Sequence, residues 1–325
     1  MIPAFDRAIP PTGYSWWYLD ALSDDGRYGI TAIAFIGSVF SPYYAWARKR
    51  ARRAADPLDH CALNVALYAR PGQPAPTGWA MTERGSGAVQ RSATRLQIGP
   101  SALEWDGSSL TVHIDEITAP WPSRLRGTVR LHPAAVLQQP YALDAGSQHH
   151  WHPIAPCARV EVDLRHPALR WQGSAYLDAN TGTRPLEQDF VRWDWSRAAQ
   201  GRDGAAGHAG SARSAVLYDV TRTDGGQTSL ALAFDVSGAV RHFPPRPHAP
   251  LPPTRWGVAR ATRADAGTRA EVVQTLEDGP FYARSLLRTD LLGEPATAVH
   301  ESLSLRRFSA PWVQSLLPFR MPRRG

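Results

Sequence analysis

Residues 14–36 read YSWWYLDALSDDGRYGITAIAFI, and this stretch predicts a β-hairpin. Tyr14 to Asp20 and Tyr28 to Ile36 are rich in the aromatic and β-branched residues that favour strands. Ser23-Asp24-Asp25-Gly26 lies between them and is typical of a turn. Similar strand-like runs separated by turn residues follow along the chain, and only residues 43–55 read as a helix. The pattern therefore predicts an all-β protein with few short helices.

The hairpin recurs later in the chain at a constant offset of 199 residues, which aligns Asp20 with Asp219. The same offset aligns Asp25 with Asp224, Gly26 with Gly225, Ala32 with Ala231, Ala34 with Ala233 and Phe35 with Phe234. Asp-Gly turns between apolar strands also recur by chance. A duplication would give two tandem antiparallel β-barrel or sandwich domains, and 325 residues suit two domains. We expect them at residues 1–165 and 166–325.

The charge balance limits the classes of partner. The net charge is +7, and Lys49 is the only lysine beside many arginines. Such a balance favours anionic partners, either nucleic acid or an anionic membrane surface. Residues 48–53 with the neighbouring aromatic residues form a candidate nucleic-acid patch, but basic and acidic residues are mixed elsewhere. We therefore expect no nucleic-acid partner.

The C-terminal tail, Ser309 to Gly325, mixes apolar and aromatic residues with arginines. This composition suits a membrane interface, although a tail packed on its own barrel would read the same way. No secretory signal is visible, and the apolar run from Ile30 to Phe40 is too short to span a bilayer. We expect a cytoplasmic protein that associates peripherally with the anionic inner membrane.

Several kinds of catalytic site are not indicated. His149, His150 and His152 alternate between the two faces of a predicted strand, so they do not form a metal site by themselves. Neither a nucleophile elbow nor a phosphate or dinucleotide loop is present, and Cys61 and Cys157 lie far apart. We expect neither a metal nor a cofactor.

A strand from Arg170 to Asp178 would place Tyr176 and Asp178 side by side on one face. His149 and Trp151 share a face of their own strand in the same way. A carboxyl group in an apolar cavity has a raised pKa, because burial penalises the charged form, and it can then act as a general acid. Pattern alone favours the simpler interpretation, in which Asp178 caps the turn that follows it.

Several long blocks resemble the bacterial carotenoid 1,2-hydratases, also called hydroxyneurosporene synthases. They are residues 13–26, 33–46, 56–65, 81–85, 176–180, 185–187 and 193–197. The resemblance implies two tandem lipocalin-like domains and cofactor-free addition of water to acyclic carotenoids such as neurosporene and lycopene. It also implies that His149, Trp151, Tyr176 and Asp178 carry the proton transfer.

On that expectation, Asp178 protonates C2 of the terminal double bond and water attacks the tertiary cation at C1. Trp151 and Tyr176 would stabilise the cation, and His149 would orient Asp178 or the water and return the proton. Two other functions remain open. One is a lipocalin-like carotenoid or isoprenoid carrier without catalysis, and the other is a β-barrel lyase or isomerase for another apolar substrate.

Overall fold

The computed structural model describes residues 3–50, 54–73, 77–201 and 213–324. Strands dominate it, so the all-β prediction is confirmed. Its α-helices are short: α1 (Pro42–Arg50), α2 (Leu186–Asp189), α3 (Leu305–Phe308) and α4 (Pro311–Leu316). The single turns η1 (Pro57–Asp59), η2 (Ser86–Ala88) and η3 (Leu317–Phe319) are 3-10 helices. Helix α1 begins where the sequence predicted a helix, and residues 51–53 of that prediction lie outside the described residues.

Internal contacts divide the chain into two compact units. Unit 1 comprises residues 1–185 and 314–325, and unit 2 comprises residues 186–313. The predicted boundary after residue 165 falls inside strand β11 (His149–His166), which pairs with β12 (Ala168–Gly182) in a single hairpin. The division between the two units therefore falls after this hairpin, and both of its strands belong to unit 1. That the chain is built from two tandem lipocalin-like domains stays a prediction.

Unit 1 is organised around one large, almost entirely antiparallel sheet. Its spatial order is β22 (Arg323–Arg324), β4 (Gly78–Arg84), β3 (Cys61–Ala69), β2 (Tyr28–Ile36), β1 (Tyr14–Ser23), β12, β11, β9 (Arg124–Pro133), β8 (Leu110–Ile117), β7 (Ser101–Trp105), β6 (Arg95–Ile98) and β5 (Val89–Arg91), and β10 (Tyr141–Ala142) pairs with β11. The predicted hairpin is thus β1 and β2. Strands β1, β12 and β11 lie in the middle of this order.

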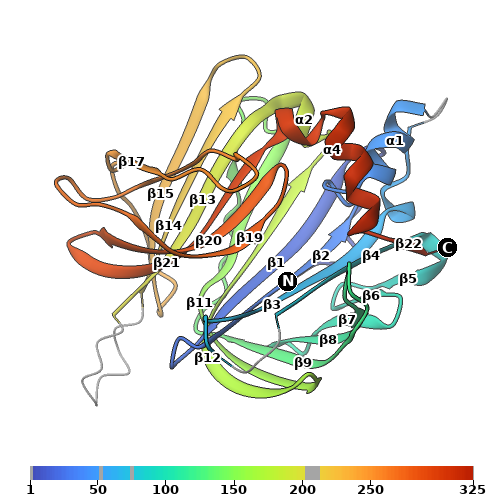
Figure 1. The fold of residues 1–325 in the computed structure, drawn as a ribbon, viewed down its shortest axis with the longest axis horizontal. Coiled ribbons are helices and arrows are strands. Elements are labelled where there is room, and N and C mark those ends of the chain that lie inside the picture. Colours follow the sequence, from blue (N-terminus) through green and yellow to red (C-terminus); the bar gives the residue numbers. More distant parts are fainter. Residues whose placement is uncertain (1–2, 51–53, 74–76, 202–212, 325) are drawn as a thin grey trace. The chain divides into compact units, whose positions relative to one another are not determined.

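The sheet curls around a single apolar core (Figure 1). Strand β4 contacts β8 and β3 contacts β6, although neither pair is adjacent in the sheet. One face of each strand enters this core, for example Trp17 and Leu19 from β1 and Ala175 and Leu177 from β12. The alternate residues of β1 and β12 lie on the opposite face, which is also buried. A strand that is buried on both faces reads as a continuous apolar run, as residues 14–22 do.

Unit 2 holds a smaller antiparallel sheet and a separate two-stranded ribbon. The sheet order is β16 (Val240–His242), β15 (Gln227–Asp235), β14 (Arg213–Arg222), β13 (Phe190–Gln200), β21 (Glu294–Ser304), β20 (Tyr282–Leu291) and β19 (Glu271–Asp278), and the ribbon pairs β17 (His248–Leu251) with β18 (Arg260–Arg263). Its apolar core includes Ala215, Leu217 and Leu287.

The repeated hairpin exists in both units, but its predicted residue equivalence holds for only one strand. Ala32 and Ala231 both enter a core, as the offset of 199 requires. Ala32 pairs with Leu19 in the first hairpin, whereas Ala231 pairs with Leu217 in the second. The first strands therefore correspond at an offset of 198, because the connection of the second hairpin is one residue longer. The alignment of Asp20 with Asp219 is wrong, since a slip of one residue moves a side chain to the other face.

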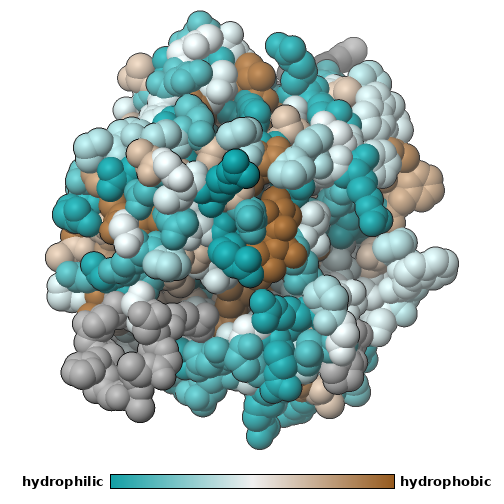
Figure 2. Space-filling model, turned by 60° about the vertical axis from the view of Figure 1, so that its left-hand side comes forward, coloured by the Kyte–Doolittle hydropathy of each residue, from teal (hydrophilic) through white to brown (hydrophobic). Residues whose placement is uncertain are grey.

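The C-terminal tail is partly packed and partly exposed. Val313, Leu317 and Met321 are buried, whereas Trp312, Leu316 and Phe319 are exposed. On the face shown in Figure 2, hydrophobic residues are interspersed among hydrophilic ones. Among the described residues, no helix is long and apolar enough to cross a membrane.

Candidate active site

The candidate site lies on the face of β1, β12 and β11 that points away from the core of unit 1. The strand register places side chains in three rows across these strands. The first row is Tyr18, Asp178 and Pro153, the second is Trp16, Asn180 and Trp151, and the third is Tyr14, Gly182 and His149. All four predicted residues thus share one buried face, and Trp171, Ala175 and Leu177 enter the core as the alternation predicted.

Asp178 is 3% exposed and receives hydrogen bonds from two of the predicted residues. Trp151 Nε1 donates to Asp178 Oδ2 at 2.7 Å, and the Tyr176 hydroxyl donates to the same oxygen at 2.9 Å. The Asn180 amide lies 3.4 Å from the other oxygen, Oδ1. Asp178 therefore belongs to a buried network that includes an indole and a phenol. It lies inside β12, which continues to Gly182, and not at the start of a turn.

Tyr176 is fully buried and remains a neutral donor. Burial raises the pKa of its phenol well above 10, and the nearby Asp178 and Asp20 carboxyl groups raise it further. The Tyr18 ring packs against it edge-on, with ring centroids 6.3 Å apart. The Tyr141 ring packs beside Trp151, with ring centroids 5.7 Å apart, so each aromatic donor to Asp178 is itself packed against a second aromatic ring.

His149 lies at the far end of the same face. Its Nδ1 is 2.8 Å from the Tyr14 hydroxyl, and its backbone N–H donates to Asp144 at 2.8 Å. The glycine between the two rings makes this contact possible, because a Cβ at Gly182 would lie 2.4 Å from the Tyr14 ring and 2.7 Å from His149 Nδ1. The register places His149 four residues along β12 from Asp178. Asp178, Tyr176 and Trp151 are directly hydrogen-bonded, whereas His149 is hydrogen-bonded to Tyr14 two rows away on the same face.

Sequence reasoning did not select several residues of this face. They are Tyr14, Trp16, Tyr18, Asp20 and Asn180, and all are at most 6% exposed. The signal was present in the opening stretch, where polar aromatic residues occupy alternate positions. These residues join the site only because β1 pairs with β12, and local sequence patterns do not predict which strands pair.

His150 and His152 lie on the opposite face of β11 from His149, as predicted, and line a hollow described below. A search of the described ranges finds no group of three or more residues suited to hold a metal ion. The absence of a metal and of a cofactor from the reaction stays a prediction.

The curled, mostly antiparallel sheet is a lipocalin-like fold. The crystal structure of an AttH-type protein from Nitrosomonas europaea shares this fold, with a TM-score of 0.63 over 94% of this chain and 96% of that chain, at 16% identity. Residues 32–325 match the family model described as carotenoid hydratase CrtC. The chain belongs to the carotenoid hydratase family.

Curated relatives agree with this assignment. The acyclic carotenoid 1,2-hydratase of Thiocapsa roseopersicina is 56% identical over 324 residues, which cover 99% of this chain and 76% of the relative. The enzyme of the same name from Rubrivivax gelatinosus is 49% identical over 99% of this chain and 76% of that relative. The one from Cereibacter sphaeroides is 40% identical over 90% of this chain and 98% of the relative.

Proposed function

We propose that this protein is an acyclic carotenoid 1,2-hydratase, a hydro-lyase that adds water across the terminal C1–C2 double bond of neurosporene or lycopene. Membership of the carotenoid hydratase family and the names of its relatives support the reaction. The structural observation that carries the mechanism is the buried Asp178 carboxyl group, with one oxygen held by an indole N–H and a phenol O–H.

In the first step, protonated Asp178 transfers its proton to C2 of the alkene. The two π electrons form the new C2–H bond, and C1 becomes a tertiary cation. Trp151 and Tyr176 both donate to Oδ2, which favours Oδ1 as the oxygen that carries the transferred proton. The carboxylate formed in this step keeps both donors, so its negative charge is stabilised as it develops.

The surrounding rings stabilise the cation in the second step. Trp151 and Tyr176 reach the carboxylate through their N–H and O–H groups, and the Tyr18 ring packs on Tyr176; a cation held over the desolvated face of one of these rings gains about 1–2 kcal/mol. Water attacks C1 and forms the C–O bond, and its surplus proton returns to the Asp178 carboxylate, giving a tertiary alcohol. No net proton or electron is consumed.

His149 serves in this proposal as an acceptor that takes up the proton of the attacking water through intervening water molecules. Four residues of extended chain span about 13 Å, so return of that proton from His149 to Asp178 requires relaying water molecules. Tyr14 holds the imidazole in place for this role.

The substrate is a bilayer component, and we propose that the protein meets it by peripheral contact with the cytoplasmic face of an anionic inner membrane. The exposed Trp312, Leu316 and Phe319 of the C-terminal tail support this contact. Two arginines of the tail have partners within the protein: Arg320 stacks on Trp79 at 4.3 Å, and Arg323 pairs with Glu83. Lipid attraction would therefore rest on the apolar side chains more than on these charges.

The test is a product assay on the full chain with lycopene in detergent or liposomes, followed by mass analysis of the extracted carotenoid. The expected result is a product heavier by one or two molecules of water. A carrier without catalysis would bind lycopene and release it unchanged. A product without added water would indicate a lyase or isomerase of another kind.

A further inference from the structure

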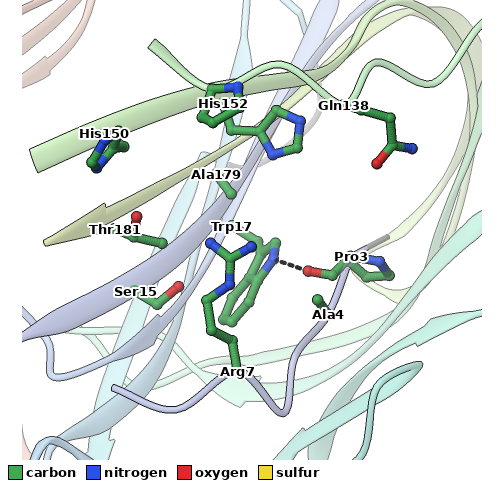
Figure 3. A pocket seen from close by; sticks show the side chains of 11 residues that line it. Pro3, Ala4, Arg7, Ser15, Trp17, Gln138, His150, His152, Ala179 and Thr181 are labelled. Carbon is green, nitrogen blue, oxygen red and sulfur yellow. Dashed lines mark hydrogen bonds between the residues drawn. The ribbon is translucent and has the colours of Figure 1, made fainter. Parts of the chain in front are cut away.

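A hollow of about 250 Å³ lies on the reverse side of the strands that carry the candidate active site. Its lining alternates with the active-site rows. Ser15, Thr181 and His150 form one row across β1, β12 and β11, and Trp17, Ala179 and His152 form the next. Arg7 and Gln138 complete its polar lining (Figure 3). Only the backbone of the sheet separates this hollow from the side chains of Trp151 and Asn180, because successive side chains of a strand point to opposite faces.

The polar side chains of the hollow are largely unused by the protein. Across residues 3–50, 54–73, 77–201 and 213–324, no hydrogen bond or ion pair engages the side chains of Arg7, Ser15, Gln138, His150 or Thr181. Ser15 is the most informative of them, because it is 2% exposed and still lines the hollow. A hydroxyl that lines a hollow and has no protein partner is available to bond a ligand or water.

The charge of the lining has one sign. Arg7 supplies a permanent positive charge, the two histidines supply imidazoles, and none of the eleven lining residues is acidic. The Arg7 guanidinium projects between Ser15 and Trp17 in Figure 3. His152 Nε2 donates to the Leu137 carbonyl at 3.0 Å, which fixes the orientation of its ring. A guanidinium with hydroxyl, amide and imidazole groups around it matches the oxygens of a phosphate group.

We propose that this hollow binds a phosphate group through Arg7, Ser15, Thr181 and His150. The group belongs either to free phosphate or to the headgroup of an anionic phospholipid, since both present the same oxygens. Binding there would stabilise β1, β11 and β12. Trp151 and Asp178 lie on the opposite face of these strands. The binding itself is independent of the proposed hydratase reaction.

The experiment compares the full chain with Arg7→Ala, Ser15→Ala and the matched control Arg165→Ala. Arg165 is an exposed arginine at the other end of β11, distant in register from the hollow. In one arm, inorganic phosphate is titrated and the imidazole NMR signals of His150 and His152 are followed. In the other arm, co-sedimentation is measured with vesicles of phosphatidylglycerol and phosphatidylcholine in equal amounts. Thermal melting of every variant confirms folding.

We expect Arg7→Ala to weaken binding about tenfold, Ser15→Ala to weaken it about threefold, and Arg165→Ala to leave it unchanged. Losses in the phosphate arm identify free phosphate as the ligand. Losses confined to the vesicle arm identify the phospholipid headgroup. Binding that is absent from both arms, or that both variants leave unchanged, overturns the proposal.

Discussion

The proposed reaction depends on the Asp178 carboxyl group, and the two side chains that donate hydrogen bonds to it come from different strands. Tyr176 lies two residues earlier on β12, whereas Trp151 comes from the neighbouring β11. Replacing the acid removes the proton source, while replacing either donor removes only part of the stabilisation of the carboxylate. The three side chains should therefore differ in the size of their effect.

Asp178→Asn should lower the hydration rate by about 10²–10⁴-fold, the usual contribution of general acid catalysis, because the amide keeps the shape but cannot give a proton to carbon. Tyr176→Phe should lower the hydration rate by a smaller factor. The measurement is the initial rate of water addition to lycopene, with the exposed Asp163 changed to Asn as the control. A full rate in Asp178→Asn would remove the acid role.

Gly182→Ala should separate Tyr14 from His149, since the new methyl group would lie within 2.7 Å of both rings. We expect a loss of about 1–3 kcal/mol in the free energy of unfolding together with a slower reaction. Gly87→Ala is the matched control, because a Cβ there would meet nothing within 4 Å. Urea denaturation and the hydration assay measure the two effects, and an unaltered variant would show that the row is not tightly packed.

Among the elements, β22 attaches the end of the chain to the edge of the large sheet. Arg323 donates to Glu83 on β4 and to the Asp59 carbonyl, and its Nη1 lies 3.0 Å from His60 Nδ1. Glu83 is 1% exposed, and within the described residues its Oε2 has no hydrogen-bond partner. The negative charge of this buried carboxylate is therefore balanced by Arg323 and by the His60 imidazole, whose Nδ1 lies 2.8 Å from Glu83 Oε1.

Arg323→Met should destabilise the protein by about 2–3 kcal/mol, because it removes the guanidinium partner of a buried carboxylate and leaves it only the His60 imidazole, 2.8 Å from Oε1; partial exposure of Arg323 keeps the effect below that of a fully buried pair. Arg324→Met, at the exposed neighbouring position, should have little effect. Urea denaturation compares the two. Adding Glu83→Gln to Arg323→Met should recover part of the loss, and equal effects of the two single variants would contradict the role of the pair.

Strand β21 carries a titratable group with a predictable effect on stability. His300 is fully buried and donates from Nε2 to the Ala261 carbonyl at 2.9 Å. Burial lowers its pKa below 6.5, and the charge of Asp194 opposes this only in part. Below pH 6.5 the unfolded chain therefore binds a proton that the folded chain does not, so stability falls as the pH falls toward the folded pKa.

His300→Gln should flatten the pH dependence of the free energy of unfolding between about pH 6.5 and 5, by at most about 1.4 kcal/mol per pH unit, since glutamine can keep the N–H donor without titrating. Chemical denaturation across this range measures it. His242→Gln, at an exposed position, provides the comparison. An identical slope in His300→Gln and in the unaltered protein would assign the pH dependence to other groups.

For the whole molecule, the net charge of +7 and the exposed apolar residues of the tail should act together at a membrane. We expect the full chain to bind vesicles that contain phosphatidylglycerol more strongly than vesicles of phosphatidylcholine alone, with binding that weakens as salt is added. Phe319→Ala should reduce binding to both. Co-sedimentation measures this, and equal binding to both vesicles at all salt concentrations would contradict the charge contribution.

Much of the fold followed from local pattern. The alternation in residues 14–36 and 170–178 predicted strands and assigned Tyr176 and Asp178 to one face and Trp171, Ala175 and Leu177 to the other. The repeated hairpin was also visible, although its register was not. A turn longer by one residue shifts one strand against its partner, and sequence similarity at the turn does not reveal this shift.

Strand geometry explains why the face of many residues could be predicted from the sequence. Side chains of an extended chain alternate whatever the rest of the protein does, so the face of each residue follows from its position along the strand. Which strands become neighbours depends on contacts between distant segments. Only the tertiary structure placed β1 beside β12 and so brought Tyr14 to His149, which lies 135 residues further along the chain. It likewise decided that Trp151 and Tyr176 meet at one oxygen of Asp178.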